Sequence, residues 1–387
     1  MIVGIVGGGA AGLYAAYLLN KVGVQTIIIE KQDRLGGNIY PVEIDGYQLD
    51  LGFQVFNPKF YPLVSSMFKE LNVETENTDM SFAIEVNDSS GNFGWGSSWG
   101  AMMSSVLRYR SRAVKFLLNA LLYSIEAKRS ESMPECPKDV LDYFLRPLAT
   151  TLWSVDQGCE DEINFQFVHN FLRNHQMFRL FSRAKWLRLR NASFSYLESL
   201  SKKLTLSRIY LNTPALAVET HDGSVSIVTQ GDKIRVDKVV LALDADYCFS
   251  LITTAGLLAS NLNAPTYANT PIVVHKDTSV LPKIRGSWNF VKKDGLSLIT
   301  YDLYRLQNVP FLVTLSNRVR INDPLFMTTL RHPLINVNLL SFRSALREIQ
   351  GKGGVYYCGA YFGNCFHEDA YVSAKNAVDR LLCSTQS

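Results

Sequence analysis

The chain has 387 residues, which is more than one hydrophobic core usually organises, so two domains are expected. Its hydrophobic content of 47% and charged content of 19% are typical of a globular protein, and its net charge of +4 is too small to predict a nucleic-acid partner. No apolar run approaches the roughly 20 residues that a membrane-spanning helix needs.

The six cysteines and the amino terminus indicate the compartment. No two cysteines form a C-x-x-C pair, so neither a zinc site nor a redox disulfide is predicted, and no metal is expected. Scattered reduced thiols are typical of a cytosolic protein. The first predicted strand begins at Ile2, which leaves no room for a signal or transit peptide, and we therefore expect a cytoplasmic protein.

A strand, a glycine-rich turn and a helix open the chain. Ile2–Val6 is a short apolar run rich in β-branched residues, typical of a buried parallel strand. A G-x-G-x-x-G motif follows: Gly7 permits the tight turn, Gly9 lets backbone N–H groups approach a pyrophosphate, and Gly12 lets the next helix pack closely. The helix predicted over Leu13–Lys21 would direct its positive N-terminal end at the phosphates.

Glu30 indicates which dinucleotide this turn binds. It closes the second predicted strand, Gln25–Ile29, close to the ~20-residue offset at which an acid binds a ribose hydroxyl. A carboxylate there repels a 2′-phosphate, so the predicted cofactor is not of the NADP type. A glycine-rich turn in an unrelated α/β protein would account for the glycines but not for Glu30.

The segment Asp33–Asn38 carries an R-x-G-G motif made by Arg34, Gly36 and Gly37. It resembles the segment that follows the second strand in FAD enzymes of the flavin-containing amine oxidase and phytoene desaturase superfamily. In those enzymes the turn passes beside the FAD pyrophosphate and leads toward the flavin, and its glycines permit the close approach. The resemblance implies FAD as the cofactor. Relatives often have arginine or histidine at the position of Asn38.

Two further groups of motifs make the resemblance specific. Asp50–Pro62 reads D-x-G-F-x-V-F-N-x-x-x-Y-P, and Cys358–Gly363 near the other end reads C-G-A-Y-F-G, followed by F-H-E-D at Phe366–Asp369. They resemble a bacterial group of predicted NAD/FAD-binding, amine-oxidase-like proteins, whose genes often lie beside a cyclopropane-fatty-acid-synthase-like methyltransferase. One departure is Asn191–Leu197, where the group usually has G-G-S-x-x-Y-V.

The resemblance implies an α/β fold in two interleaved parts. One is a Rossmann-type FAD-binding domain of the glutathione-reductase-like, amine oxidase type, expected to be discontinuous over residues 1–60, 200–250 and 345–387. The other is an α+β substrate domain over residues 61–199, which contain a helical insertion, and 251–344.

The stretch after the first FAD-binding piece is predicted to be mainly helical. Gly91–Gly100 is typical of a hairpin or loop. Met102–Ala127 has a helical pattern with one apolar face, formed by Leu107, Val114, Leu117, Leu118, Leu121 and Leu122. Val140–Phe144 and Phe165–Leu172 are further candidate helices. We expect an apolar substrate cavity between this insertion and the flavin.

Residues 173–190 combine six basic residues with interleaved aromatic and aliphatic ones, and no acid occurs from Ile163 to Leu197. One interpretation is a solvated basic face. The alternative is a docking surface for phospholipid headgroups, which would place the protein at the membrane periphery, or for an acyl carrier. No recognised nucleic-acid module frames the segment, and no nucleic-acid partner is predicted.

The rest of the chain returns to the predicted FAD-binding domain through a β-meander over Ile209–Leu243, with a hairpin turn at Asp222-Gly223. Thr270–His275, Ser297–Thr300 and Phe311–Leu315 are predicted strands of the substrate domain.

The last helix is predicted to begin near His367 and to face the flavin pyrimidine ring, where its dipole would stabilise negative charge on reduced flavin. Glu368 or Asp369 is a candidate for a ribityl contact, and Asp369 is equally suited to cap the helix. The candidate catalytic residues are His367, as an acid or base near neutral pH, and Tyr301, as a residue of the flavin or substrate pocket. A structural role is the alternative for both.

The predicted FAD contacts come from the two glycine motifs, the Gly52-Phe53 segment, the meander and the carboxyl end. They are Gly7, Gly9, Ala11, Gly12, Glu30, Lys31, Arg34, Gly36, Gly37, Asn38, Gly52, Phe53, Ala215, Gly359, Glu368 and Asp369.

The leading hypothesis is an FAD-dependent, desaturase- or oxidase-like enzyme that removes hydrogen from an apolar small molecule or acyl chain, with hydride transfer to flavin N5. The acyl part derives largely from the resemblance. One alternative is a flavin amine oxidase, with Lys276, Lys283 and Lys292 as candidates for a lysine that holds water at the flavin. The other is a non-redox flavoprotein, either an isomerase or a partner of a methyltransferase.

Overall fold

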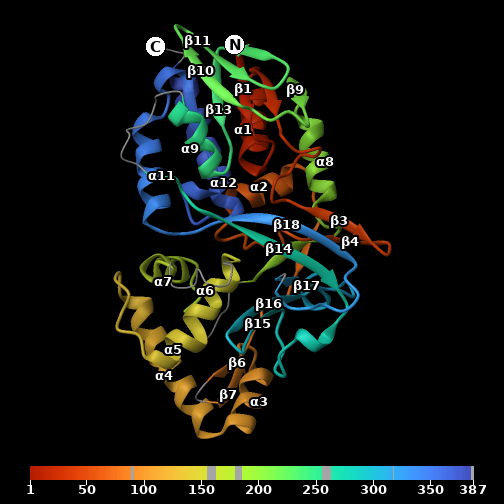
Figure 1. Cartoon of the computed structure of the whole chain (residues 1–387), viewed down its shortest axis with the longest axis vertical. Helices are drawn as coiled ribbons and strands as arrows, with labels where there is room; N and C mark the ends of the chain where they lie inside the picture. The colour runs from red at the N-terminus through yellow and green to blue at the C-terminus, as the bar shows by residue number, and fades with distance from the viewer. Residues whose placement is uncertain (89–90, 155–162, 179–184, 255–262, 317, 385–387) are drawn as a thin grey trace.

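A computed structural model describes residues 1–88, 91–154, 163–178, 185–254, 263–316 and 318–384. Figure 1 shows two lobes along the long axis of the molecule, with both chain termini in the upper lobe. The strands β14 (Tyr267–His275) and β18 (Phe326–Pro333) run where the lobes meet.

The upper lobe is built on a parallel sheet of five strands. Its order is β19-β13-β1-β2-β9, and every neighbouring pair is parallel. The strands are β1 (Ile2–Val6), β2 (Gln25–Ile29), β9 (Ser207–Tyr210), β13 (Lys238–Leu241) and β19 (Val355–Tyr357). The first two strands have the predicted bounds.

The strands β1, β13 and β19 are covered on both faces, which explains why they are largely apolar without alternation. Ile5 packs on one face against α1 and α12, whereas Val239 packs on the other face against a small antiparallel sheet and the helices α9 and α11. The predicted α/β class with a Rossmann-type domain is confirmed. The covering elements are α1 (Ala10–Lys21), α12 (His367–Cys383), α9 (Ala245–Thr254), α11 (Val337–Ile349), β10 (Ala217–His221), β11 (Ser224–Val228) and β12 (Lys233–Val236).

The lower lobe is built on a sheet of seven strands in the order β18-β14-β17-β16-β15-β6-β7. β15 and β6 are parallel, and the other neighbouring pairs are antiparallel. Besides β14 and β18, its strands are β6 (Phe82–Asp88), β7 (Gly91–Gly96), β15 (Trp288–Lys293), β16 (Leu296–Asp302) and β17 (Leu312–Leu315).

A helical insertion packs beside the seven-stranded sheet (Figure 1). The region predicted to be helical, Met102–Ala127, is divided between two helices, because Arg110 has a positive φ of 48° and separates them. The elements are α3 (Trp99–Tyr109), α4 (Ser111–Arg129), α5 (Lys138–Val140), a π-helical turn (Leu141–Leu145), α6 (Arg146–Leu152) and α7 (Phe165–Asn174).

The predicted apolar face of α4 also differs from the face that the structure buries. Phe116 and Tyr123 point into the core, whereas Val114, Leu118 and Leu122 are exposed. Leucine and valine at helical spacing indicate that a helix has an apolar face, but not whether that face is buried. Here the face opposite to it packs into the lower lobe.

Shorter elements complete both lobes. Val64, Phe68 and Tyr196, on α2 and α8, belong to the buried cluster around α1 and α12. The core of the upper lobe therefore includes segments on the far side of the predicted boundaries at residues 60 and 200. None of the described helices is long and apolar enough to cross a bilayer. The elements are β3 (Pro41–Ile44), β4 (Tyr47–Asp50), α2 (Pro62–Glu70), β5 (Thr75–Asn77), β8 (Leu187–Leu189), α8 (Phe194–Lys203), α10 (Leu303–Gln307) and 3₁₀ turns at Thr278–Val280, Lys352–Gly354 and Ala360–Phe362.

Candidate functional site

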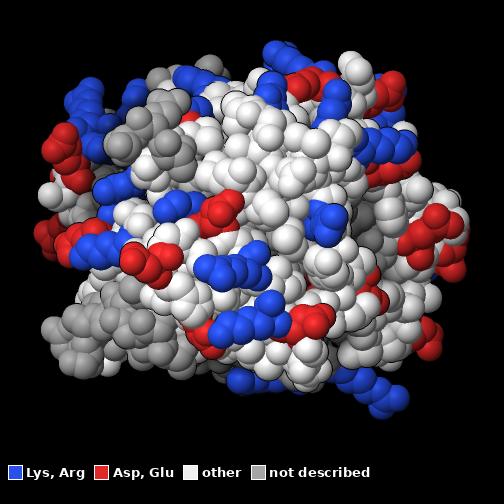
Figure 2. Space-filling model, turned by 90° about the horizontal axis from the view of Figure 1, so that it is seen from above, with Lys and Arg blue, Asp and Glu red and all other residues white. Residues whose placement is uncertain are grey.

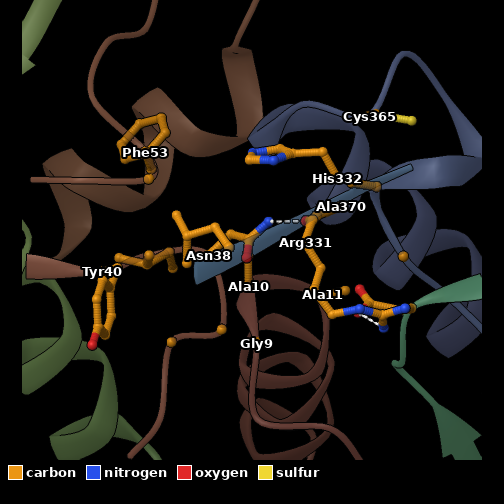
Figure 3. Close-up of a pocket in the computed structure, with 18 of the residues that line it drawn as sticks. Gly9, Ala10, Ala11, Asn38, Tyr40, Phe53, Arg331, His332, Cys365 and Ala370 are labelled. Atoms are coloured by element: carbon orange, nitrogen blue, oxygen red, sulfur yellow. Dashed lines mark hydrogen bonds and ion pairs between the residues drawn. The ribbon is translucent and has the colours of Figure 1, made fainter. Parts of the chain in front are cut away.

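One cavity of about 1050 Å³ is lined by residues of both lobes and by most of the predicted FAD contacts. This volume is at or above the roughly 300–1,000 Å³ typical of small-molecule sites. Figure 3 shows how Gly9, Asn38, Phe53 and Arg331 come together from different elements around the N-terminus of α1. The predicted residues that line the cavity are Gly7, Gly9, Ala11, Glu30, Lys31, Arg34, Gly36, Gly37, Asn38, Gly52, Phe53, Ala215, Tyr301, Gly359 and His367.

Steric constraints shape the glycine turn after β1. Gly7 has a φ of 106°, and a Cβ on Gly12 would lie 1.9 Å from the Gly7 oxygen. Gly12 packs beneath the turn and is not among the residues that line the cavity. A Cβ on Gly9, by contrast, would meet nothing nearer than the Gly37 Cα at 3.9 Å. Because α1 begins at Ala10, its N-terminal N–H groups and positive dipole end lie at the cavity.

Glu30 ties the end of β2 to this turn. Its carboxylate is 7% exposed and accepts hydrogen bonds from the N–H groups of Gly8 at 2.6 Å and Gln32 at 2.8 Å. Lys31 follows it and places its ammonium group 3.8 Å from the ring centre of Tyr247. The acid at the end of the second strand is therefore held in a fixed orientation beside the cavity, as binding of a ribose hydroxyl requires.

Arg34 holds the R-x-G-G turn together from within. Its guanidinium donates to the Gly37 carbonyl at 2.9 Å and lies 3.8 Å from the ring centre of Tyr40. The turn packs on the first glycine turn, because Gly9 and Gly36 form a β-bridge. The two glycine motifs thus make one continuous wall of backbone along the cavity.

Asn38 joins the two lobes. Its side-chain amide donates to the backbone carbonyl of Arg331 on β18 at 3.1 Å (Figure 3). Its own carbonyl accepts from the Phe53 N–H at 3.1 Å. A Cβ on Gly52 would lie 1.9 Å from that carbonyl oxygen, so this crossing of two chain segments requires glycine.

Arg331 is a cavity residue that sequence reasoning did not predict. Its guanidinium pairs with Asp244 at 2.8 Å and with Asp246, and it lies 4.6 Å from the ring centre of Tyr247. These contacts hold β18 of the lower lobe against the start of α9 in the upper lobe. No local signal marks Arg331, because its acidic partners lie 85 and 87 residues away in the chain.

The two predicted catalytic residues line the cavity, and the hydroxyl of Tyr301 and Nε2 of His367 are bonded to the protein. Nε2 of His367 lies 3.0 Å from the hydroxyl of Tyr196, which bonds in turn to the hydroxyl of Tyr371. Burial lowers the pKa of His367 to about 3, so the imidazole is neutral near pH 7, whereas the sequence predicted a group poised there. Tyr301 donates to the Thr151 carbonyl at 3.2 Å, and burial raises its pKa to about 12.

Glu368 and Asp369 do not line the cavity, which differs from their predicted contacts with FAD. The two carboxylate oxygens of Glu368 accept the N–H groups of Leu63 and Val64, each at 3.0 Å, and so cap the N-terminus of α2. Asp369 accepts from the Phe366 N–H at 3.0 Å and caps its own helix, the alternative role that the sequence left open.

Part of the predicted basic stretch is bound to acidic residues of β5 and its neighbour. Arg188 is buried and pairs with Glu76, and Arg190 pairs with Glu74 at 2.6 Å. Residues 179–184 lie outside the described residues. Arg188 therefore has an internal structural role, whereas the pair of Arg190 with Glu74 lies at the surface, where both side chains are more than half exposed.

Asp50 is a buried acid outside the cavity. It is 3% exposed, and its carboxylate accepts from the Ser193 N–H at 3.0 Å. Burial raises its pKa to about 7, against the opposing effects of the Ser193 hydrogen bonds and of Arg188. Ala192, beside this contact, has a φ of 49°, a conformation that favours glycine. The loop that departs from the G-G pattern of the relatives therefore has a glycine-type turn without the glycine.

We expect Asp50→Asn to stabilise the protein more at about pH 8 than at about pH 5. The pKa of Asp50 is higher in the folded than in the unfolded chain. Between about pH 4 and 7 the folded state therefore retains a proton that the unfolded state releases. The free energy of unfolding falls by up to about 1.4 kcal/mol per pH unit over that range. The asparagine oxygen can still accept the Ser193 N–H. Thermal unfolding of both proteins at the two pH values measures the difference, and equal shifts in Tm at both would contradict the raised pKa.

The glycine turn, the acid at the end of β2 and the parallel sheet define a Rossmann-type dinucleotide-binding protein. The family described as an NAD(P)-binding Rossmann-like domain matches residues 5–71. A 1-hydroxycarotenoid 3,4-desaturase from Flavobacterium sp. (strain P99-3) is 37% identical over 71 residues, which are 18% of this chain and 14% of the desaturase. The chain thus matches less than two thirds of that relative's length.

Two solved structures are similar over almost the whole chain. A putative protoporphyrinogen oxidase from Exiguobacterium sp. 255-15 has a TM-score of 0.70 at 17% identity, covering 99% of both chains. Cyclohexylamine oxidase from Brevibacterium oxydans IH-35A has a TM-score of 0.68 at 13% identity, covering 100% of this chain and 99% of the oxidase. The chain therefore has the fold of these two oxidases, and the fold that the resemblance predicts is confirmed.

Proposed function

We propose that the protein is an FAD-dependent oxidoreductase that removes hydrogen from an apolar substrate carrying an aliphatic or acyl chain. The observation that carries this proposal is the composition of the cavity, which extends from the glycine turn into a compartment with apolar walls from the helical insertion and the seven-stranded sheet. Side chains of this compartment include Met80, Leu152, Phe171, Met177, Ile272 and Leu315.

The residues of the upper lobe fit FAD. The position of a Cβ on Gly9 is unobstructed by protein atoms, which leaves room for a diphosphate beside the N-terminus of α1. Glu30 would bind a ribose hydroxyl, Ala215 would contact the adenine, and Gly359 and Phe53 would lie toward the flavin. Bound FAD supplies a two-electron acceptor for the hydrogen that leaves the substrate.

The charged residues of the cavity support an apolar substrate. The carboxylates that line it, Glu30, Asp33 and Asp244, all belong to the upper lobe. Lys31 and Arg34 belong to the same lobe, and Arg331 on β18 is paired with Asp244 and Asp246. Burial lowers the pKa of His332, which lines the lower part on β18, to about 4, so its imidazole is neutral near pH 7. The compartment therefore offers neutral side chains that can orient a chain and exclude water, without a charge to hold an ammonium group.

The amine oxidase alternative has less support from the geometry. None of the three candidate lysines, Lys276, Lys283 and Lys292, is among the described residues that line the cavity, and Lys276 pairs with Asp45 at 3.0 Å. Amine oxidases commonly hold the amine in an aromatic cage. The rings of Trp288 and Tyr301 have centres 4.8 Å apart and planes inclined at 54°, so they do not form two parallel walls of such a cage.

Anaerobic reduction of the flavin tests the proposal. We expect unsaturated or methylated fatty acids and phospholipids to bleach the flavin absorbance band of the holoprotein. Leu152→Trp should slow bleaching by about tenfold or more without loss of colour, because the indole fills part of the compartment. Leu296→Trp, at an exposed strand end, is the matched control and should bleach at the rate of the unaltered protein.

Other outcomes would identify the alternatives. Hydrogen peroxide release from simple amines, with no bleaching by any acyl chain, would replace the proposal with an amine oxidase. A flavin that no substrate reduces, in a protein that retains a methyltransferase in a pull-down, would favour the non-redox flavoprotein.

A further inference from the structure

The two consecutive helices α3 and α4 expose large apolar side chains to solvent. On α3 these are Trp99, Met103 and Leu107, of which Trp99 is 72% and Leu107 is 76% exposed. Their spacing of four residues places them along one side of the helix. Scattered exposed leucines are ordinary on protein surfaces, but a continuous apolar row marks an interaction site.

A second exposed apolar row lies on α4, which has apolar residues on two opposite faces. Val114, Leu118, Leu122 and Ile125 are exposed at spacings of three and four residues, and Leu122 is 64% exposed. The inward face is supplied by other residues, such as Phe116, which is buried in the core of the lower lobe. The outward row is therefore not needed to attach α4 to the rest of the protein.

Residues 99–129 also hold the positive charge of the chain. They contain six Lys or Arg residues and a single acid, Glu126, which gives them a net charge of +5. The other 33 basic and 34 acidic residues of the chain give the remainder a net charge of −1. Five of the six cations are exposed: Arg108, Arg110, Lys115, Lys128 and Arg129.

Exposed apolar rows together with a net charge of +5 favour one kind of binding partner for residues 99–129. A second copy of the chain would bring the same +5 surface against itself, which like-charge repulsion disfavours. An anionic surface that also accepts apolar side chains has the complementary chemistry, and a bilayer containing acidic phospholipids is such a surface. Long basic side chains can reach headgroups while leucine, methionine and tryptophan enter the acyl boundary.

The position of the helices suits contact with a flat surface. Figure 1 shows α3 and α4 at the lower end of the long axis, away from both termini and from the five-stranded sheet. Figure 2 views the molecule from the opposite end, where Lys and Arg side chains are interspersed with Asp and Glu. The basic segment with exposed apolar rows is thus at one end of the molecule.

We propose that residues 99–129 form a membrane-docking surface through which the protein binds, in plane and reversibly, to bilayers rich in anionic phospholipid. The exposed apolar rows of α3 and α4 insert at the acyl boundary, and the five exposed cations contact the headgroups. The docking does not depend on the proposed reaction, so vesicle binding and flavin reduction can succeed or fail separately.

Co-sedimentation with vesicles tests this proposal on the full holoprotein. We expect binding to vesicles of phosphatidylcholine mixed with phosphatidylglycerol, little binding to phosphatidylcholine alone, and weakening at high salt. Leu122→Glu should reduce the partition coefficient by about tenfold or more, because it removes apolar contact and adds a repelled charge. Met327→Glu is the matched control, since Met327 is 61% exposed on β18 and lies outside the docking surface.

A second pair of measurements separates docking from self-association and from misfolding. Leu122→Glu should retain its far-ultraviolet circular dichroism and its Tm, because the side chain it replaces is exposed. Sedimentation velocity should show no change in mass between the two variants. Equal binding of both variants to anionic vesicles, or a dimer that only Leu122→Glu dissociates, would overturn the proposal.

Discussion

Gly9→Val is expected to yield a folded protein without flavin. The backbone at Gly9 has an ordinary φ of −78°, and the nearest atom to an added Cβ is 3.9 Å away, so the protein itself accepts the side chain. The valine methyl groups would instead occupy the cavity at the N-terminus of α1, where the diphosphate must approach the backbone. The absorbance spectrum of the purified protein, before and after incubation with FAD, measures the loss.

Two further substitutions give this experiment its controls. Gly231→Val introduces the same side chain at a glycine with no neighbouring atom within 4 Å of an added Cβ, and it should remain fully yellow. Gly12→Ala should fail to fold, because its Cβ would lie 1.9 Å from the Gly7 oxygen. Normal flavin content in Gly9→Val would show that the dinucleotide does not lie along the glycine turn.

Glu368→Ala is expected to destabilise the protein by about 2–4 kcal/mol without altering the affinity of the folded protein for FAD. The substitution leaves the N–H groups of Leu63 and Val64, which Glu368 caps at 3.0 Å, without their acceptor. It also removes a negative charge from the N-terminus of α2. Denaturant unfolding measures the stability, and fluorescence titration with FAD measures the affinity.

Glu368→Gln provides the comparison for this prediction. The glutamine oxygen can cap one of the two N–H groups, so its loss of stability should lie between those of the unaltered protein and Glu368→Ala. A drop in FAD affinity with unchanged stability would instead support the ribityl contact that the sequence suggested for Glu368. The two measurements therefore distinguish a helix cap from a cofactor ligand.

The wall of the cavity that faces the cofactor could be predicted from local sequence. Gly7, Gly9 and Glu30 lie within one β-α-β unit, where the order of elements is set by neighbouring residues and the steric need for glycine can be read position by position. The R-x-G-G turn is similarly local, because Arg34 bonds to carbonyls within five residues of it. The motifs at Asp50–Pro62 and Cys358–Gly363 are also short and local, and their resemblance to the amine-oxidase-like group predicted the fold.

The contacts between distant segments could not be predicted in this way. Glu368 reaches a helix whose backbone lies 305 residues earlier, and Arg331 clamps the lobes through acids 85 and 87 residues away. The leucines of α4 have the same spacing whether they face core or solvent, and only the packing of Phe116 on the lower lobe shows which side is outside. Local geometry follows from short-range sterics and hydrogen bonds that the order of residues contains. Burial depends on which surfaces meet when the whole chain folds. It therefore decides the raised pKa of Asp50 and the role of the Glu368 carboxylate as a helix cap.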